Sequence, residues 1–182
     1  MSDLALDFYD IVFNIDSFAD LKAESDDGWK IDMTDTGENK YNFFSNLDSK
    51  DNIQVNRIGV LGASGVGKTF VLEKLINKYD KFKNQKIKTK GISVIYPEIE
   101  SKNLFVCLDS QGSEEPIIEK KLTIEEIFNL SDKDKKKVIK ESLKDKKMTE
   151  IFIQDFIIDK ANILIIVVDQ LTFSEQKLIY RL

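Results

Sequence analysis

The sequence has a single cysteine, and it has no long apolar segment. Cys107 can form no disulfide within the chain, and because it lies in the apolar run LFVCLD we expect it to pack as a small hydrophobic residue. The longest uninterrupted apolar run, ILIIVV at 163–168, is far shorter than the roughly 20 residues that a membrane span needs. The N-terminal MSDLALDFYD is acidic where a signal peptide would be basic. These features predict a cytoplasmic protein in a reducing compartment.

Charge is distributed unevenly along the chain. Residues 1–56 carry 13 acidic and four basic residues, whereas the rest carries 19 acidic and 23 basic ones. An acidic arm therefore precedes a mildly basic body. Six lysines at 78–90 are either a solvated face or a patch for phosphates or anionic lipid, which leaves peripheral membrane contact open. No groove-reading motif accompanies them, so nucleic acid is not expected as a partner.

The length fits one well-packed domain and is too short for two ordinary ones. We expect an N-terminal extension at 1–52, with one or two short strands, to pack on a body at 53–182. From residue 57 onward strands and helices alternate, and the strands are continuously apolar, which is typical of a parallel sheet covered on both faces. We therefore predict a three-layer α/β fold of the P-loop NTPase type, with a mostly parallel sheet and helices on both faces.

The expected strands are at 57–61, 92–99, 103–109 and 162–169, and the expected helices are at 69–82, 149–161 and 172–182. Pro97 places the second strand at an edge of the sheet or bends it. The last strand is expected to be fully buried. Capping-box-like starts at Thr123 and Ser131 predict two consecutive helices between 123 and 146.

The segment GASGVGKT at 62–69 fits the pattern G-x-x-x-x-G-K-[ST] in full, and it lies between a strand and a helix as this motif requires. Its glycines let successive backbone N–H groups converge on a phosphate at the positive end of the helix. Lys68 is predicted to reach the β- and γ-phosphates, and Thr69 to offer its hydroxyl to Mg²⁺. All loop residues are assigned to nucleotide binding: Gly62, Ala63, Ser64, Gly65, Val66, Gly67, Lys68 and Thr69. The alternative is a glycine-rich turn that binds nothing.

A second site signal follows the strand LFVCLD, which ends in Asp109 with Gly112 three residues later. A carboxylate at the tip of a strand next to the loop strand can hold Mg²⁺ through water, and Gly112 can donate its N–H to the γ-phosphate. Thr89, in a lysine-rich loop, can close over that phosphate and give its hydroxyl to Mg²⁺, the loop being ordered only while the phosphate is present. The predicted catalytic residues are Lys68 and Thr89, and the predicted metal ligands are Thr69, Thr89 and Asp109. An ordinary turn aspartate and an ordinary loop threonine remain the alternatives.

Together, GASGVGKT, TKGISV and LFVCLDSQG resemble the phosphate loop, first switch and second switch of a GTPase of the dynamin superfamily. The Thr-x-Gly-Ile switch and the Leu-Asp-x-x-Gly strand end are most similar to the branch of guanylate-binding proteins and atlastins. The resemblance covers roughly residues 53–175. It implies GTP or GDP with Mg²⁺ as ligands, and a homodimer that forms with the nucleotide.

The sequence departs from this family at the positions that accelerate hydrolysis. Gly65 stands where that branch has an arginine inside the phosphate loop. Ser113 stands where a Ras-like GTPase has a water-orienting glutamine, and Gln111 precedes the glycine and is not its equivalent. Such groups contribute on the order of 10³ or more in rate, so intrinsic hydrolysis is expected to be slow unless a partner or second protomer supplies the missing group.

The motif that reads guanine is also missing from its expected place. NKYD at 77–80 matches the letters but lies inside the expected helix after the phosphate loop, where it would face away from a base. We interpret the chain as an incomplete G domain that stops before the guanine-reading strand. The preference for guanine therefore rests on the resemblance.

These features favour a GTP-hydrolysing switch or driver of self-assembly. The charged segment 113–148 is interpreted as a helical insertion at the second switch, either a partner-binding arm or a solvated elaboration. A P-loop nucleotide kinase or ABC-type ATPase is a second reading, although the Leu-Ser-Gly-Gly-Gln signature is missing and Arg57 and Arg181 are the only arginines. A pseudo-GTPase or scaffold with little turnover is a third, favoured by the missing arginine and glutamine.

Overall fold

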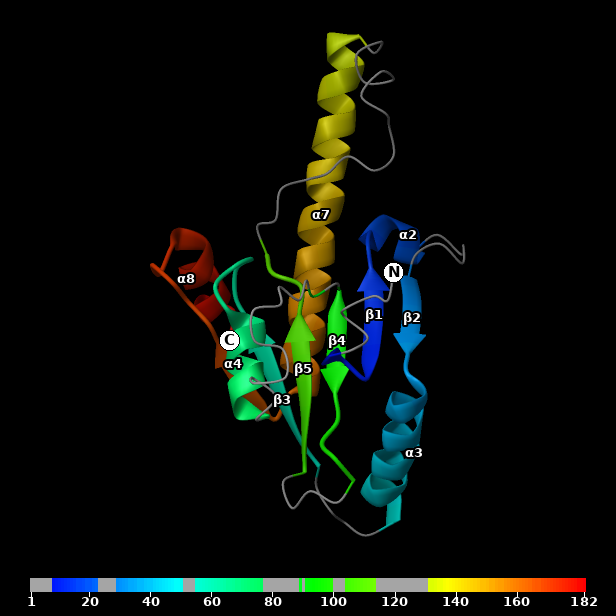
Figure 1. Cartoon of the computed structure of the whole chain (residues 1–182). Coiled ribbons are helices and arrows are strands. Elements are labelled where there is room, and N and C mark those ends of the chain that lie inside the picture. Colours follow the sequence, from blue (N-terminus) through cyan, green and yellow to red (C-terminus); the bar gives the residue numbers. More distant parts are fainter. Residues whose placement is uncertain are drawn as a thin grey trace.

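The computed structural model describes residues 8–22, 29–50, 55–76, 89, 91–99, 104–113 and 131–182. These residues form one sheet of six strands in the order β2-β1-β4-β5-β3-β6 (Figure 1). The strands are β1 (Ile11–Ile15), β2 (Trp29–Met33), β3 (Asn56–Leu61), β4 (Ile92–Ile95), β5 (Phe105–Ser110) and β6 (Ile163–Ile166). The helices are α2 (Phe18–Lys22), α3 (Asp35–Lys50), α4 (Lys68–Leu75), α7 (Asp132–Lys160) and α8 (Phe173–Tyr180).

Most strands of the sheet run in one direction. β3 pairs in parallel with β5 on one side and with β6 on the other. β4 is antiparallel to both β5 and β1, so β1 points the same way as the three parallel strands, and β2 is antiparallel to β1 at the edge. The predicted α/β fold class is confirmed. Val60 pairs with Asp109, so the carboxyl ends of β3 and β5 lie side by side. Open α/β sheets bind their ligands at the carboxyl ends of the strands.

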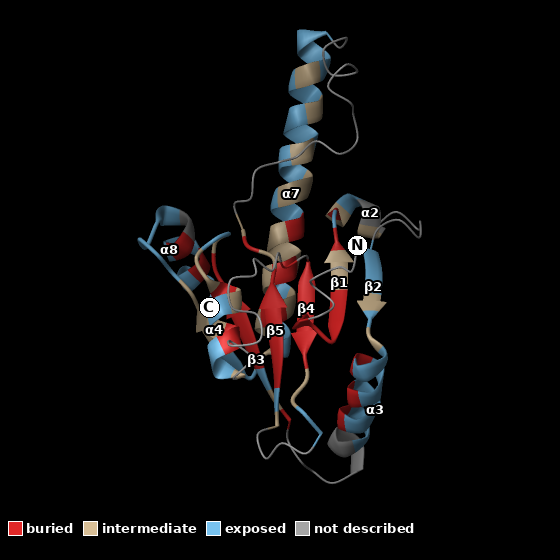
Figure 2. Ribbon diagram, viewed as in Figure 1, coloured by how far each residue is buried: buried red, intermediate tan, exposed pale blue. Residues whose placement is uncertain are grey.

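Apolar residues cover both faces of the sheet. Ile153 and Ile157 of α7 pack in a core cluster on one face. On the other face, Leu72 of α4 packs with strand residues and with Phe8 and Tyr9, which precede β1. Figure 1 shows α4 in front of β3 and α7 behind the sheet. The strands between these helices are largely buried (Figure 2), which gives the three layers expected from the alternation of strands and helices.

α7 is one continuous helix where the sequence predicted a break. The prediction of one helix ending at 146 and another starting at 149 is wrong, because α7 runs through both positions. No proline or glycine occurs in its sequence, so nothing interrupts the helix. Its predicted start is confirmed, since the side chain of Ser131 accepts a hydrogen bond from the backbone N–H of Asp134. The other predicted start, at Thr123, lies outside the described residues.

Residues 132–148 of the predicted insertion form the N-terminal half of α7, and residues 114–130 lie outside the described residues. This half projects beyond the sheet, and its side chains are mostly exposed (Figures 1 and 2). Whether it is a partner-binding arm or a solvated elaboration stays open. None of the helices in the described part of the chain is both long and apolar enough to cross a membrane.

The N-terminal strands extend the sheet beyond β4. β1 pairs with β4, and α2 is fixed to α7. The backbone N–H of Phe18 donates to Thr149 Oγ1 at 2.9 Å, and that of Ala19 donates to Asp145 Oδ1 at 2.7 Å. The described part of the extension therefore shares one sheet with the body, while the boundary at residue 52 stays a prediction.

Two strand predictions need correction, and one packing prediction holds. β4 ends at Ile95 and lies between β1 and β5, so Pro97 follows the strand and does not mark an edge. β6 is shorter than predicted and is not fully buried, with Ile163 45% exposed, because it pairs only with β3 in the described sheet. Cys107 is buried and packs in the core as predicted.

Gly59 of β3 lets α7 approach the sheet closely. A Cβ at this position would lie 2.6 Å from Cγ2 of Ile157 and 2.9 Å from Cβ of Ala161. Gly59→Ala is therefore expected to lower the free energy of unfolding by about 1–3 kcal/mol in urea denaturation, the usual cost of overpacking a core. Ile157→Ala removes the obstructing methyl group, so the double variant should lose less than the sum of the single losses. Additive losses would contradict the close contact.

Candidate functional site

The predicted phosphate loop at 62–69 connects β3 to α4. The backbone of Gly65 and Gly67 has positive φ angles of 80° and 92°, a conformation that residues with a side chain rarely adopt. Gly67 directly precedes α4, and no side chain among the described residues caps this helix start. The N-terminus of α4 therefore carries the partial positive charge that favours a phosphate.

Lys68 is the first residue of α4, and its side chain returns toward the start of the loop. The residue is 7% exposed, and its Nζ donates to the carbonyl oxygen of Ala63 at 2.8 Å. A buried ammonium group therefore lies against the phosphate loop. An anion bound by the loop would meet this positive charge as well as the amides.

Three side-chain oxygens from distant parts of the sequence meet next to this loop. Thr69 lies in the first turn of α4, Thr89 precedes β4, and Asp109 lies near the end of β5. Thr69 Oγ1 is 2.8 Å from Asp109 Oδ2 and 3.1 Å from Thr89 Oγ1. Thr89 Oγ1 is 3.1 Å from the same carboxylate oxygen. The structure therefore brings together all three residues that the sequence suggested as metal ligands.

The spacing of these oxygens fits Mg²⁺. This ion prefers octahedral oxygen ligands at about 2.0–2.1 Å, so neighbouring ligand oxygens lie about 2.9 Å apart. The three observed separations, 2.8, 3.1 and 3.1 Å, are those of hydrogen bonds among the side chains, and they are compatible with that value. Within the described residues no group of three or more His, Cys, Asp or Glu side chains could hold a metal. The observed cluster combines the carboxylate of Asp109 with the hydroxyl groups of Thr69 and Thr89.

Asp109 lies in a buried environment that favours a nearby cation. The residue is fully buried, and this burial raises the pKa of its carboxyl group above the usual value. Hydrogen bonds from Tyr9 and Thr69 and the charge of Lys68 act in the opposite direction and lower the pKa. A buried carboxylate is costly unless it is paired or coordinates a metal, so a cation beside Asp109 would relieve this cost.

Tyr9 joins the same cluster, and sequence reasoning missed it. Its hydroxyl donates to Asp109 Oδ2 at 2.5 Å and lies 2.8 Å from Thr89 Oγ1 and 3.5 Å from Thr69 Oγ1. Burial, followed by the charge of Asp109, raises the pKa of the phenol well above its usual range, so it stays protonated. The only sequence signal was an aromatic pair, FY, before an apolar strand, which is typical of a core segment.

The segment after β5 packs directly on the phosphate loop. The N–H of Ser64 donates to the carbonyl of Ser113 at 2.8 Å, and the N–H of Ser113 donates to the carbonyl of Gly62 at 3.4 Å. A Cβ on Gly112 would lie 2.3 Å from the Cα of Ser64, so a side chain at 112 would push the two segments apart. The structure thus brings Gly112 to the loop, while its hydrogen bond to a γ-phosphate stays a prediction.

The side chains that could replace the missing catalytic groups are engaged elsewhere. Gln111 Oε1 accepts from the N–H of Gly91 at 3.0 Å, so this side chain joins the segments before β4 and after β5. Arg181 in the C-terminal region forms an ion pair with Asp155 of α7. Arg57 lies near the start of β3, whereas the phosphate loop follows the end of this strand. Neither arginine of the chain therefore lies at the phosphate loop.

Two sequence predictions cannot be placed. The NKYD segment at 77–80 and the lysine-rich stretch that follows it lie outside the described residues, except for Thr89. Two statements therefore stay predictions. One is that NKYD matches the guanine-reading motif by chance, and the other is that the lysines form a solvated face or a patch for phosphates or anionic lipid.

Comparison with known proteins supports the interpretation of the loop. A family model described as 50S ribosome-binding GTPase matches residues 57–181. The match includes the whole phosphate loop together with Thr89, Asp109 and Gly112, whereas Tyr9 lies outside it. Comparisons with curated proteins and with solved structures gave no match.

Proposed function

Because the chain belongs to the family of 50S ribosome-binding GTPases, we propose that it hydrolyses GTP to GDP and phosphate at the loop 62–69, with Mg²⁺ as the metal. GTP binding follows from the family, and hydrolysis as a switch or driver of self-assembly is the proposed step. The observation that carries this proposal is the meeting of Thr69, Thr89 and Asp109 next to the loop.

Each residue of the site has a proposed role. The loop amides and the first amides of α4 bind phosphate oxygens. Lys68 stabilises the negative charge that develops on the transferred phosphoryl group, and the N–H of Gly112 donates to the γ-phosphate. Thr69, Thr89 and Asp109 hold the metal. When bound, Mg²⁺ neutralises charge on the phosphate oxygens.

Intrinsic hydrolysis by this chain is expected to be slow. Both arginines lie away from the loop, and Gln111 is bonded to Gly91. Faster hydrolysis then requires a second copy of the chain or another partner to supply the group that stabilises the transition state. Membership of the branch of guanylate-binding proteins and atlastins, a homodimer that forms with the nucleotide, contact with a membrane surface and a cytoplasmic location are parts of this proposal.

Nucleotide competition followed by phosphate release tests the proposed function. In the presence of Mg²⁺, unlabelled GTP is expected to displace a fluorescent GTP analogue at lower concentrations than ATP, because the family is one of GTPases. Phosphate release is then measured at increasing protein concentration, and a rate per molecule that rises with concentration would support activation by a second copy.

The alternative functions give different results in the same experiment. Equal displacement by ATP, or transfer of phosphate from ATP to GMP, would favour an ATPase or nucleotide kinase. Tight GTP binding with no release above the uncatalysed rate would favour a pseudo-GTPase that works by protein contact.

A further inference from the structure

Tyr9 is the member of the oxygen cluster that lies outside the segment matched by the family model. Its hydroxyl donates to Oδ2 of Asp109, the same oxygen to which Thr69 and Thr89 donate. It also lies 2.8 Å from the hydroxyl of Thr89. The N-terminal segment therefore contributes a hydrogen-bonding group to the proposed metal site of the GTPase body.

The ring of Tyr9 reaches the cluster from the protein core. The residue is 1% exposed and packs between the sheet and α4, in the cluster that contains Val60 and Leu72. The rings of Tyr9 and Phe8 pack edge to face, with their centroids 4.8 Å apart. Because the ring is rigid and packed, the position of its hydroxyl is well defined.

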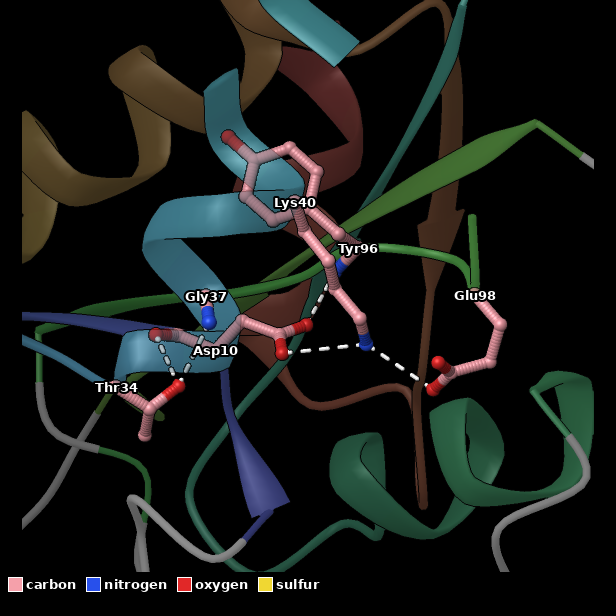
Figure 3. Close-up of polar contacts among 6 residues, drawn as sticks. All are labelled: Asp10, Thr34, Gly37, Lys40, Tyr96 and Glu98. Carbon is pink, nitrogen blue, oxygen red and sulfur yellow. Dashed lines mark hydrogen bonds and ion pairs between the residues drawn. The ribbon is translucent and has the colours of Figure 1, made fainter. Parts of the chain in front are cut away.

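The residue next to Tyr9 anchors this segment (Figure 3). Asp10 Oδ2 accepts a hydrogen bond from the backbone N–H of Tyr96 at 2.7 Å, and Oδ1 lies 3.4 Å from Nζ of Lys40. The side chain of Lys40 is 4% exposed, and its Nζ also lies 3.0 Å from Glu98 Oε1. A buried ion pair is costly to separate, so this network resists displacement of the segment.

We propose that Tyr9 is a positioning residue of the magnesium site, whose hydroxyl holds Thr89 and Asp109 in the arrangement that the ion requires. The N-terminal segment thereby orders the first switch through contacts within the chain. This inference rests on the proposed function of the same site. Groups that orient metal ligands in this way contribute about 10- to 100-fold to metal affinity, since a ligand that is already placed loses less freedom on binding.

The variant Tyr9→Phe tests this inference because it removes only the hydroxyl. The affinity for a fluorescent GTP analogue is measured with Mg²⁺ and with EDTA. We expect the affinity in Mg²⁺ to fall about 10- to 100-fold and the affinity in EDTA to stay unchanged. Tyr180→Phe is the matched control, because it removes a tyrosine hydroxyl from a side chain of α8 that is 90% exposed. It should leave both affinities as in the wild type.

Circular dichroism establishes that the variant is folded, and thermal unfolding provides a second measurement. Adding Mg²⁺ to the protein with the GTP analogue should raise the melting temperature less in Tyr9→Phe than in the wild type, because the ion binds the folded state more weakly. This difference can be measured even if the variant is less stable overall.

Each other outcome contradicts the inference. An unchanged effect of Mg²⁺ would show that the hydroxyl does not position the ligands, and tighter binding in Mg²⁺ would show that it blocks the ion. Equal losses in Mg²⁺ and EDTA would indicate a general structural role. A wild-type protein whose GTP binding does not depend on Mg²⁺ would refute the proposed metal site itself, a result distinct from failure of Tyr9→Phe alone.

Discussion

Lys68→Ala is expected to weaken binding of a fluorescent GTP analogue by about 30-fold or more. Lys68 is buried against the phosphate loop, with its Nζ 2.8 Å from the carbonyl of Ala63. Truncating one partner of a buried, hydrogen-bonded charge pair costs about 2–5 kcal/mol, and each 1.4 kcal/mol is about tenfold in affinity. Fluorescence titration of the purified variant measures the loss directly.

Lys74→Ala is the matched control for this experiment. Lys74 lies in the last turn of the same helix, where its Nζ lies 5.5 Å from the centre of the Phe70 ring. This substitution also removes one positive charge from α4, but at the end of the helix that is farther from the loop. Nucleotide affinity should therefore stay close to that of the wild type. If Lys68→Ala kept wild-type affinity, the assignment of the phosphate site would be wrong.

Asp109→Asn is expected to remove the dependence of GTP binding on Mg²⁺. Three hydroxyl groups converge on Oδ2 of Asp109, and the residue is fully buried, so this side chain supplies the negative charge of the proposed metal site. Removing one member of a buried charge pair costs about 3–5 kcal/mol, so Mg²⁺-supported affinity should fall by on the order of 100-fold or more. Titrations in Mg²⁺ and EDTA should then give similar affinities.

The exposed acid Asp159, whose side chain pairs with Lys160 at the end of α7, provides the control for this substitution. Asp159→Asn removes one negative charge far along the sequence from the site, and the effect of Mg²⁺ should be unchanged. A full effect of Mg²⁺ in Asp109→Asn would exclude this carboxylate from the metal site.

The same variant should also change how stability depends on pH. Burial raises the pKa of Asp109 in the folded protein, so without Mg²⁺ the folded state binds this proton more tightly than the unfolded state does. The stability that this group contributes is then complete below the unfolded pKa of about 3.9 and is lost as the pH rises through the higher folded pKa. Asparagine does not titrate. In urea denaturation with EDTA, the free energy of unfolding of Asp109→Asn should therefore rise relative to that of the wild type as the pH increases. If the two free energies changed with pH in parallel, this expectation would be contradicted.

The phosphate loop could be predicted because its chemistry is local. Eight consecutive residues fix the positive φ angles, the helix start and the lysine, and the structure places them between β3 and α4. Asp109 could be proposed from one further rule, that the carboxyl ends of adjacent parallel strands meet at the same edge of the sheet. Its pairing partner Val60 lies one residue before the end of β3, so the two ends do meet.

The predictions of a fully buried β6 and of a break in α7 were wrong because the sequence pattern of a segment does not specify which other segments pack against it. The apolar run of β6 predicted a fully buried strand, but apolar residues also occur in a strand that pairs on one side only. The cap at Ser131 was real, but the predicted break at 147–148 was wrong: no proline or glycine interrupts this segment, and α7 continues through it to the buried turns around Ile153 and Ile157. Helix length depended on what those turns pack against.

By itself, the sequence determined the α/β class and the phosphate loop, because periodicity and an eight-residue motif act over short stretches of chain. Only the tertiary structure decided that β1 lies beside β4 and that Tyr9 joins the oxygen cluster of Thr69, Thr89 and Asp109. The hydrogen bonds of this tyrosine to Thr89 and Asp109 span 80 and 100 residues, and contacts of that range leave no pattern in a single sequence. They form because one packed core between the sheet and α4 holds both segments.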